Sequence, residues 1–164
     1  MIEEAFLKYS ADEMLVLGNR IDDCLKRLTA EQIWTRKSDN ENAVGNIVLH
    51  LCGNVRQWII SGVGGQPDVR DRDSEFAARG GMEPAQLAAK LKSTVGEASI
   101  VIRHLPVARL GERKVIQKIY DTTLMEAIYH VVEHFAQHTG QIIFATKLLT
   151  GDDLGFFKHL SKSV

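Results

Sequence analysis

Proline is scarce in this sequence: the 164 residues include only Pro67, Pro84 and Pro106. All three lie between the long segments in which apolar residues recur at helical spacing, so none of them breaks a helix. Long apolar runs are also missing, since none approaches the roughly 20 residues that a membrane-spanning helix needs. These absences favour an all-helical chain with no membrane-spanning segment.

The sequence also has only two cysteines and a net charge close to zero. Cys24 and Cys52 could form at most one bridge, and a core of this size does not depend on a disulfide scaffold, so buried reduced thiols are expected. The 20 Lys and Arg nearly balance the 21 Asp and Glu, giving a net charge of -1. Without a cluster of basic residues, no nucleic acid and no membrane surface is expected as a partner.

The first ten residues, MIEEAFLKYS, carry acidic side chains where a secretory signal would carry basic ones. We therefore expect a cytoplasmic protein.

Four long segments have apolar residues at spacings of three and four, which is typical of amphipathic helices. The predicted helices cover residues 2–28, 43–60, 87–105 (with Pro84 in the first turn) and 123–150. A capping box at 29–32 adds one short turn after the first helix. The sequence thus predicts one domain over residues 1–164 with an all-α fold, a four-helix bundle with long crossover connections.

Two connections are longer than those that usually join bundle helices. Residues 62–83 are rich in glycine and charge, and at about 3.3 Å per extended residue they can cross a whole bundle, which would let the flanking helices run parallel. A lid over a site is the alternative. Residues 107–122 contain VIQKIY, whose alternation fits either a short strand or an extended segment. After Gly151, the tail is expected to pack Leu154, Phe156 and Phe157 on the bundle.

Histidines are the most informative feature, because four of the six fall on two predicted helices. His134 and His138 lie one turn apart on the last helix and share a face. His130 lies one turn earlier, and Gln141 falls between the pair in angle. Their imidazoles can therefore converge at the edge of the apolar arc, where a cleft would lie.

His50 occupies a matching position on the second long helix, beside the apolar arc and next to Asn46 and Asn54. One His from one helix and an i, i+4 pair from another make three nitrogen ligands and leave a position of a divalent metal open for water or substrate. Cys52 points about 200° away from His50 on an ideal helix and cannot supply a fourth ligand.

Other interpretations of these histidines remain. An i, i+4 pair is common on helices that bind no metal, and a lone His is more often a partly solvated neighbour of the core. For His104, contact with a helix C-terminus is a sufficient explanation. A ferritin-like site fails because no Glu has His three positions later. The His130–His134 stretch matches a peptidase pattern with Glu133 as base, but no Glu follows it as the further ligand.

The segment NIVLHL around His50 and the segment His134-Phe-Ala-Gln-His138-Thr-Gly-Gln141 together resemble the DinB-like superfamily of four-helix metal-binding bundles, over the full length of the chain. The resemblance implies metal ligands at His50, His134 and His138, a long crossover after the second helix, and often a homodimer. Better-understood relatives use the metal to activate a low-molecular-weight thiol for transfer or isomerisation.

These observations predict a metal-dependent enzyme acting on a small-molecule substrate, of thiol-transferase or isomerase type. Its metal would be a divalent ion, Zn²⁺ first, with Ni²⁺ or Fe²⁺ also suited to three imidazoles. Asn46, His130 and Gln141 are candidates for supporting a ligand or binding substrate. The alternatives are a metal-activated hydrolase and a bundle that binds metal or a small ligand without turnover.

The last helix carries more apolar residues than one core-facing stripe requires. They are Ile128, Val131, Val132, Phe135, Ile142, Ile143, Leu148 and Leu149. A homodimer is therefore expected, with the Phe156–Phe157 tail as the alternative cover.

Overall fold

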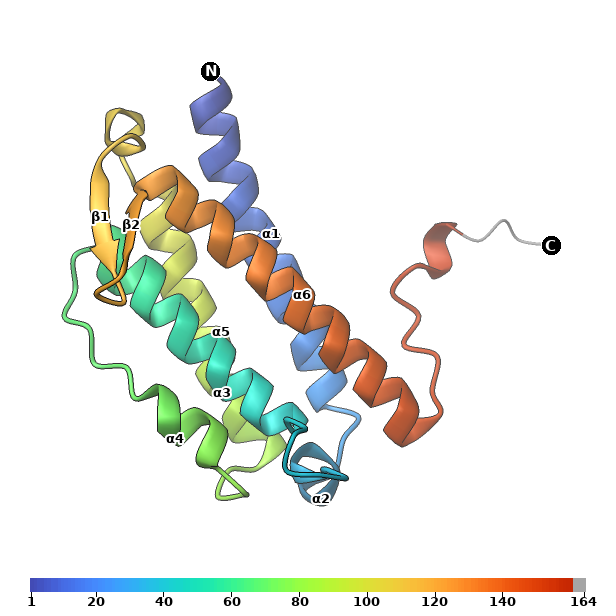
Figure 1. The fold of residues 1–164 in the computed structure, drawn as a ribbon. Coiled ribbons are helices and arrows are strands. Elements are labelled where there is room, and N and C mark those ends of the chain that lie inside the picture. Colours follow the sequence, from blue (N-terminus) through green and yellow to red (C-terminus); the bar gives the residue numbers. More distant parts are fainter. Residues whose placement is uncertain (161–164) are drawn as a thin grey trace.

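A computed structural model describes residues 1–160, and residues 161–164 at the end of the predicted domain and tail lie outside the described residues. The helices are α1 (Ile2–Leu25), α2 (Ala30–Trp34), α3 (Val44–Val55), the π-helix η1 (Arg56–Val63), α4 (Arg72–Ala77), α5 (Pro84–Arg103), η2 (Val107–Arg109), α6 (Leu124–Thr150) and η3 (Lys158–Leu160). The strands are β1 (Arg113–Ile116) and β2 (Tyr120–Thr123). Four long helices, α1, α3 with η1, α5 and α6, pack as a bundle (Figure 1), so the predicted all-α fold is confirmed.

The long crossover makes two neighbouring helices parallel. After η1, the chain returns along the outside of the bundle through α4, and α5 then starts at the same end as α3 (Figure 1). As a result, α3 and α5 run in one direction and α1 and α6 in the other. The crossover prediction is confirmed, and α4 brings part of this connection against α3.

Capping residues fix the ends of α6 where the sequence predicts them. The hydroxyl of Thr123 accepts from the backbone N–H of Glu126, while the Glu126 carboxylate accepts from the N–H of Thr123. At the other end, Gly151 adopts φ 74°, a left-handed conformation that favours glycine. These caps define both ends of the helix that carries His130, His134 and His138.

Two helix boundaries differ from the prediction. Helix α1 ends at Leu25, and the chain continues as a turn in which Leu28 is still buried, so its apolar spacing extends past the helix. The second long helix extends beyond residue 60, but it changes at Arg56 into the wider turns of a π-helix. Such turns inside helices are often found at functional sites.

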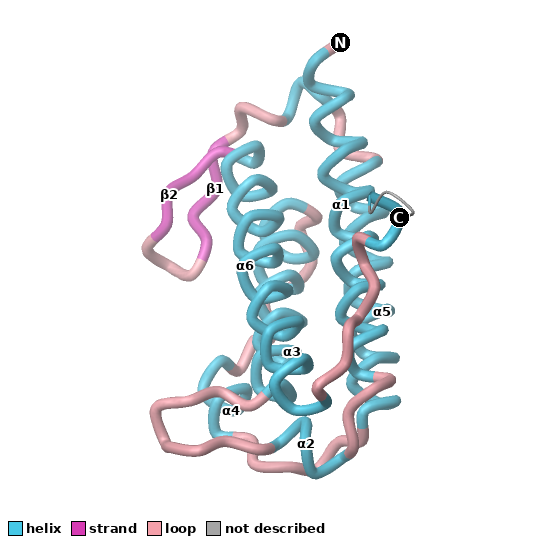
Figure 2. The backbone as a smooth tube through the Cα atoms, turned by 90° about the vertical axis from the view of Figure 1, so that its right-hand side faces the viewer, coloured by secondary structure: helices cyan, strands magenta, loops and turns pink. Residues whose placement is uncertain are grey.

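The segment VIQKIY, which the sequence left open, forms a hairpin. Strands β1 and β2 pair antiparallel with Arg113 opposite Thr123 and Ile116 opposite Tyr120. Ile116 packs so closely on Gly62 of η1 that any side chain at position 62 would collide with it. The hairpin therefore lies beside η1 and the first turns of α6 (Figure 2).

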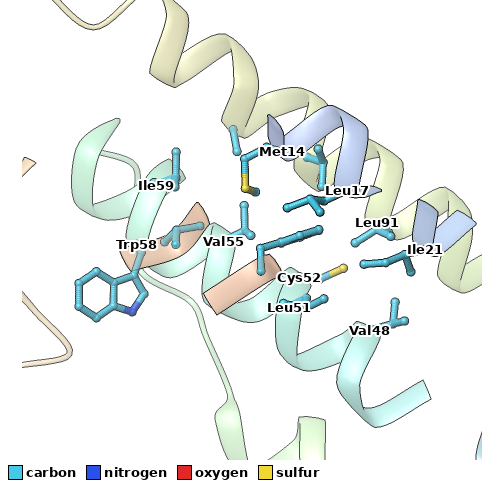
Figure 3. Packing of buried hydrophobic residues seen from close by; sticks show 14 of the residues in the cluster. Met14, Leu17, Ile21, Val48, Leu51, Cys52, Val55, Trp58, Ile59 and Leu91 are labelled. Carbon is cyan, nitrogen blue, oxygen red and sulfur yellow. The ribbon is translucent and has the colours of Figure 1, made fainter. Parts of the chain in front are cut away.

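Cys52 faces the bundle interior with Leu17 and Leu91, whereas the indole of Trp58 points away from that cluster at its edge (Figure 3). Both cysteines are free and buried. Burial raises the pKa of Cys52 to about 11. A thiol in this state is inert, which agrees with the predicted reduced thiols.

The tail packs on the bundle through part of the predicted set. Leu154 is buried and Phe156 is partly buried against the core. Phe157 is 58% exposed, although the guanidinium of Arg20 lies 5.3 Å from its ring centroid. Within residues 1–160, no helix is both long enough and apolar enough to cross a membrane.

Candidate metal centre

Three histidines from two helices meet where α3 lies beside α6. Nε2 of His134 lies 3.1 Å from Nε2 of His50 and 3.1 Å from Nε2 of His138. His50 is buried, and the other two are half-buried at the edge of the core. The structure thus brings together the three residues that the sequence singles out, as a group that could hold a metal ion.

The spacing of these nitrogens suits a cation. Metal–nitrogen bonds of about 2.1 Å, at angles from about 90° to about 110°, separate two ligand nitrogens by about 3.0–3.4 Å. The two measured separations of 3.1 Å fall in this interval. Lone pairs directed at one another at this distance repel unless a positive charge lies between them.

His138 is oriented through its other ring nitrogen. Its Nδ1 lies 2.7 Å from Oε1 of Gln141, one turn further along α6. The amide oxygen can only accept, so it selects the tautomer with the proton on Nδ1 and leaves the lone pair on Nε2. Gln141, which the sequence offered as a supporting or substrate-binding residue, here supports His138.

His50 is oriented by an ion pair from the crossover. Its Nδ1 lies 3.3 Å from Oε2 of Glu75 and 3.1 Å from Nη2 of Arg70. Arg70 donates to both carboxylate oxygens of Glu75, each at 2.8 Å, which is the bidentate geometry that fixes a carboxylate in place. In the tautomer whose Nε2 is free to bind a metal, the proton is on Nδ1 and the Glu75 carboxylate is the group that can accept it.

Burial pushes the pKa of Glu75 upward, but the hydrogen bonds from Arg70 and His50 and their charges outweigh it. The pKa of Glu75 therefore lies below its usual value, and the carboxylate is charged at neutral pH. A charged acceptor behind an imidazole fixes the tautomer and the ring orientation in which it can bind a metal.

Asn46 and Gly53 position Glu75 against α3. The amide of Asn46 donates to the carbonyl oxygens of Glu75 and Ala78, both at 2.9 Å, and its own oxygen accepts from the N–H of Ala43. These bonds occupy the buried Asn46 side chain, so it anchors α4 rather than facing a substrate. Gly53 leaves the space that the Glu75 carboxylate fills, since a Cβ there would overlap Oε1.

A cleft of about 920 Å³ opens beside the three histidines. Trp58, His130 and Tyr120 line one wall, where the indole lies 4.4 Å from His130 and 5.6 Å from Tyr120 between ring centroids. His130 lies 5.6 Å from His134 between ring centroids and lines the cleft without joining the convergent group. Tyr129 is 65% exposed and does not line this cleft.

Two further interpretations from the sequence concern His104 and Glu133. His104 is the C-cap of α5, and its Nδ1 lies 2.9 Å from the carbonyl oxygen of Ile100, as its position at the helix end predicts. Glu133 is exposed and accepts from Gln137. It therefore faces away from the site, and the peptidase pattern has no base in place.

Burial, more than any other effect, lowers the pKa of the α6 histidines. The pKa of His134 falls to about 3, with a further contribution from the charges of His138, His50, His130 and Arg70. The pKa values of His138 and His130 are also lowered, chiefly by burial. The imidazoles of α6 are therefore neutral at pH 7, which is the form that binds a metal.

These shifts predict that the metal-free protein loses stability as the pH falls below about 6.5. In that range the unfolded chain binds protons at these histidines while the native chain does not, so unfolding is favoured by acid, and the loss continues toward pH 3 at His134. Urea unfolding at a series of pH values measures the slope. His134→Gln should flatten it, while His104→Gln should not, and equal slopes in both variants would contradict the assignment.

Sequence reasoning missed Arg70 and Glu75. Both lie in the crossover, where no periodic pattern marks them. The signal that could have found them is Gly53: a glycine inside a helix, one turn from His50, points to close approach of another group.

The chain belongs to the family described as "Protein of unknown function (DUF1572)", whose model matches residues 1–161. No curated protein matches the chain. A crystal structure of a conserved protein from Enterococcus faecalis superposes with a TM-score of 0.70 at 16% identity, over 88% of this chain and 96% of that one. At this identity the similarity shows the fold alone.

Proposed function

We propose that the protein is a metal-dependent enzyme of the thiol-transferase type, in which His50, His134 and His138 hold a divalent ion, preferentially Zn²⁺. The observation that carries the proposal is the convergence of three Nε2 atoms at 3.1 Å spacing on one side of an open cleft. Within residues 1–160, no Cys, Asp or Glu joins this group as a fourth ligand. That donor set is typical of catalytic rather than structural sites.

The family resemblance supports the same conclusion. The motif from His134 to Gln141 and the single His of α3 are the features by which the chain resembles the DinB-like superfamily, whose better-understood members activate small thiols. A divalent ion in such a site lowers the pKa of a thiol or water in its open position and so supplies a nucleophile near neutral pH.

The protein's own residues orient the imidazoles of the site, offer a proton acceptor and line part of the cleft with apolar surface. Glu75 and Gln141 fix the two outer imidazoles. His130 faces the cleft with a neutral, half-buried ring, so one of its nitrogens can take the proton that an entering thiol releases. Trp58 and Phe76 line the cleft with apolar surface and limit water around the reacting atoms.

The experiment uses protein loaded with Co²⁺ as a coloured substitute for Zn²⁺. Adding 2-mercaptoethanol is expected to change the visible spectrum in a saturable way, and a thiol plus 1-chloro-2,4-dinitrobenzene should turn over only with metal present. A spectrum that no thiol or small anion changes would mean a closed site and would refute the proposal. Ester hydrolysis without any thiol requirement would indicate the hydrolase alternative.

We also propose that the chain forms a homodimer through α6. Ile128, Val131, Phe135 and Ile142 are buried in the core, so the surplus apolar surface lies elsewhere on this helix. The residues left exposed are Met125 (49%), Tyr129 (65%), Phe144 (65%) and Leu148 (69%). A contact between two copies would bury these side chains, and a stable one removes at least about 1,000 Å² from water.

Sedimentation at micromolar concentration is expected to give twice the 18.3 kDa of one chain. The double variant Phe144→Glu, Leu148→Glu should sediment as a monomer, because charges cannot be buried in an apolar contact. Ile100→Glu, at a site 61% exposed on α5, is the control and should remain dimeric. A native chain that sediments only as a monomer would refute the dimer.

A further inference from the structure

A second cavity, of about 730 Å³, adjoins the cleft beside the histidines. The two cavities share Arg70, Arg72 and Gln117 in their walls, so together they extend from the three histidines to the β1–β2 hairpin. The hairpin and the crossover both line this second cavity, and η1 contributes Gln57, Ser61 and Gly62. A ligand with one end at the histidines could therefore reach the hairpin.

The second cavity is lined by positive charge that has no counter-charge of its own. Arg72, Lys114 and Lys118 face it, and within residues 1–160 none of the three has a carboxylate within ion-pairing distance. Arg72 instead stacks on Phe76, with its guanidinium carbon 4.8 Å from the ring centroid. Asp68 is the acidic residue in this lining, and its carboxylate accepts from Gln57 and from the backbone of Arg70.

The acidic residues of the first cleft are already engaged. Asp121 pairs with Arg113, and Glu126 caps α6 through the Thr123 backbone. Among residues 1–160, the charges of the combined cleft without an ion-pair partner are therefore the three cations and the carboxylates of Asp68 and Glu126, which leaves a net positive charge. Cations grouped in a concave site raise the local concentration of an anionic ligand.

Asn54 adds a polar group between the two ends. It lies one turn beyond His50 on α3, is 4% exposed and lines the first cleft. Within the described chain its Oδ1 is buried without a hydrogen-bond partner. An unpartnered buried acceptor is rare in folded proteins and points to a hydrogen-bond donor from a ligand or a water.

The turn of the hairpin holds the basic end of the cleft in place. Gln117 and Lys118 occupy its centre with φ 53° and 65°, left-handed conformations that non-glycine residues seldom adopt. The Gln117 amide donates to Oε1 of Gln57 at 2.7 Å and ties the turn to η1. This hydrogen bond holds the turn that carries Lys118 against η1, and both Lys114 and Lys118 line the cavity.

We infer that the combined cleft binds a small anionic molecule, with its metal-binding group at the three histidines and its carboxylate or phosphate groups at Arg72, Lys114 and Lys118. The metal-binding end rests on the proposed function, whereas the anionic end rests on the hairpin cavity alone. The substrate class is accordingly a low-molecular-weight thiol that carries negative charge some distance from its sulfur.

The test compares two thiols of equal length on Co²⁺-loaded protein: 6-mercaptohexanoate, whose carboxylate lies at the far end of the chain from its sulfur, and 6-mercapto-1-hexanol, which carries no charge. The carboxylate thiol is expected to bind more tightly, and Lys114→Gln with Lys118→Gln should reduce that preference about 5- to 10-fold, the effect of two exposed ion pairs. Binding of 6-mercapto-1-hexanol should change less than about twofold, because the histidine end is intact.

Lys92→Gln with Lys147→Gln is the matched control, since it removes the same charge from lysines of α5 and α6 that line neither cavity. It should keep the preference. Equal losses in both double variants, or no loss in the first, would overturn the inference.

A measurement on metal-free protein separates this inference from the proposed function. Inorganic pyrophosphate is expected to shift the NMR amide signals of residues 70–72 and 114–118, and the hairpin double variant should abolish those shifts. An absence of shifts overturns the anionic end even if thiols bind the metal. Shifts without any response of the cobalt spectrum to thiols would support the anionic end and refute the thiol-transferase proposal.

Discussion

His134→Ala is expected to abolish stoichiometric metal binding, with a fall in affinity of more than about 100-fold. The reason is its central position, since its Nε2 lies 3.1 Å from both of the other Nε2 atoms. Loss of a group that merely supports a ligand already costs about 10- to 100-fold in affinity, so loss of a ligand costs more. Metal analysis of purified protein and competition with a coloured chelator measure the change.

His50→Ala and His138→Ala should have the same effect, and His130→Phe is the control. The ring of His130 packs on Trp58 and stays outside the convergent group, so its replacement should leave metal content unchanged. A His134→Ala protein that keeps one metal per chain would remove His134 from the site. A His130→Phe protein that loses its metal would instead make His130 a ligand.

Thermal or urea unfolding gives a second measure of the same loss. Metal at 100 times its Kd stabilises the native state by about 2.7 kcal/mol. This gain should appear in the native protein and disappear in His134→Ala. The metal-free form of the variant should remain folded, because the buried Nδ1 of His134 has no hydrogen-bond partner within residues 1–160 to lose.

The positions of the three histidines could be predicted because they depend on local geometry. An i, i+4 pair shares a helix face in any α-helix, and the apolar arc shows which way that face is turned. His50 is on a second helix of the same kind, so the bundle itself brings the three together. Gln141 likewise follows from helix spacing relative to His138.

The support of His50 could not be predicted in this way. Arg70 and Glu75 lie on the crossover, and their place against α3 depends on contacts between segments distant in sequence: the Asn46 amide, the space at Gly53, and the bidentate ion pair itself. The sequence suggested Asn46 as a group near the metal. The structure shows that it acts on the backbone of α4 instead.

The hairpin and the π-helix could not be predicted from the sequence for the same reason. Four residues per strand and alternation over VIQKIY do not distinguish a strand from an extended loop. In the folded chain the hairpin also packs on η1 through the close contact of Ile116 with Gly62, which lies far away in the sequence. Glycines at close contacts, Gly53 and Gly62 here, are thus the sequence features that marked these tertiary contacts.

Gly53→Ala tests whether Glu75 positions His50. Its expected effect on metal affinity differs from the effect of a general loss of stability. The added methyl group would overlap Oε1 of Glu75 and lie 2.6 Å from its carboxyl carbon. The carboxylate is the end of a flexible side chain, so it can move away from His50 while the helix stays intact. Alanine is also favoured over glycine inside a helix by about 1 kcal/mol, which offsets part of the cost of displacing Glu75 and its partner Arg70.

We therefore expect Gly53→Ala to lower metal affinity about 10- to 100-fold, as for other groups that orient a metal-binding histidine, while the urea midpoint of the metal-free protein changes little. Gly96→Ala is the matched control, because a Cβ at that position of α5 meets no atom within 4 Å. It should raise stability slightly and leave metal affinity unchanged.

If Gly53→Ala binds metal as the native protein does, then the Arg70–Glu75 pair stabilises the crossover and has no part in orienting His50. If affinity and stability fall together, the effect is on the fold. A fall in affinity alone is the result that the geometry of His50, Glu75 and Gly53 predicts.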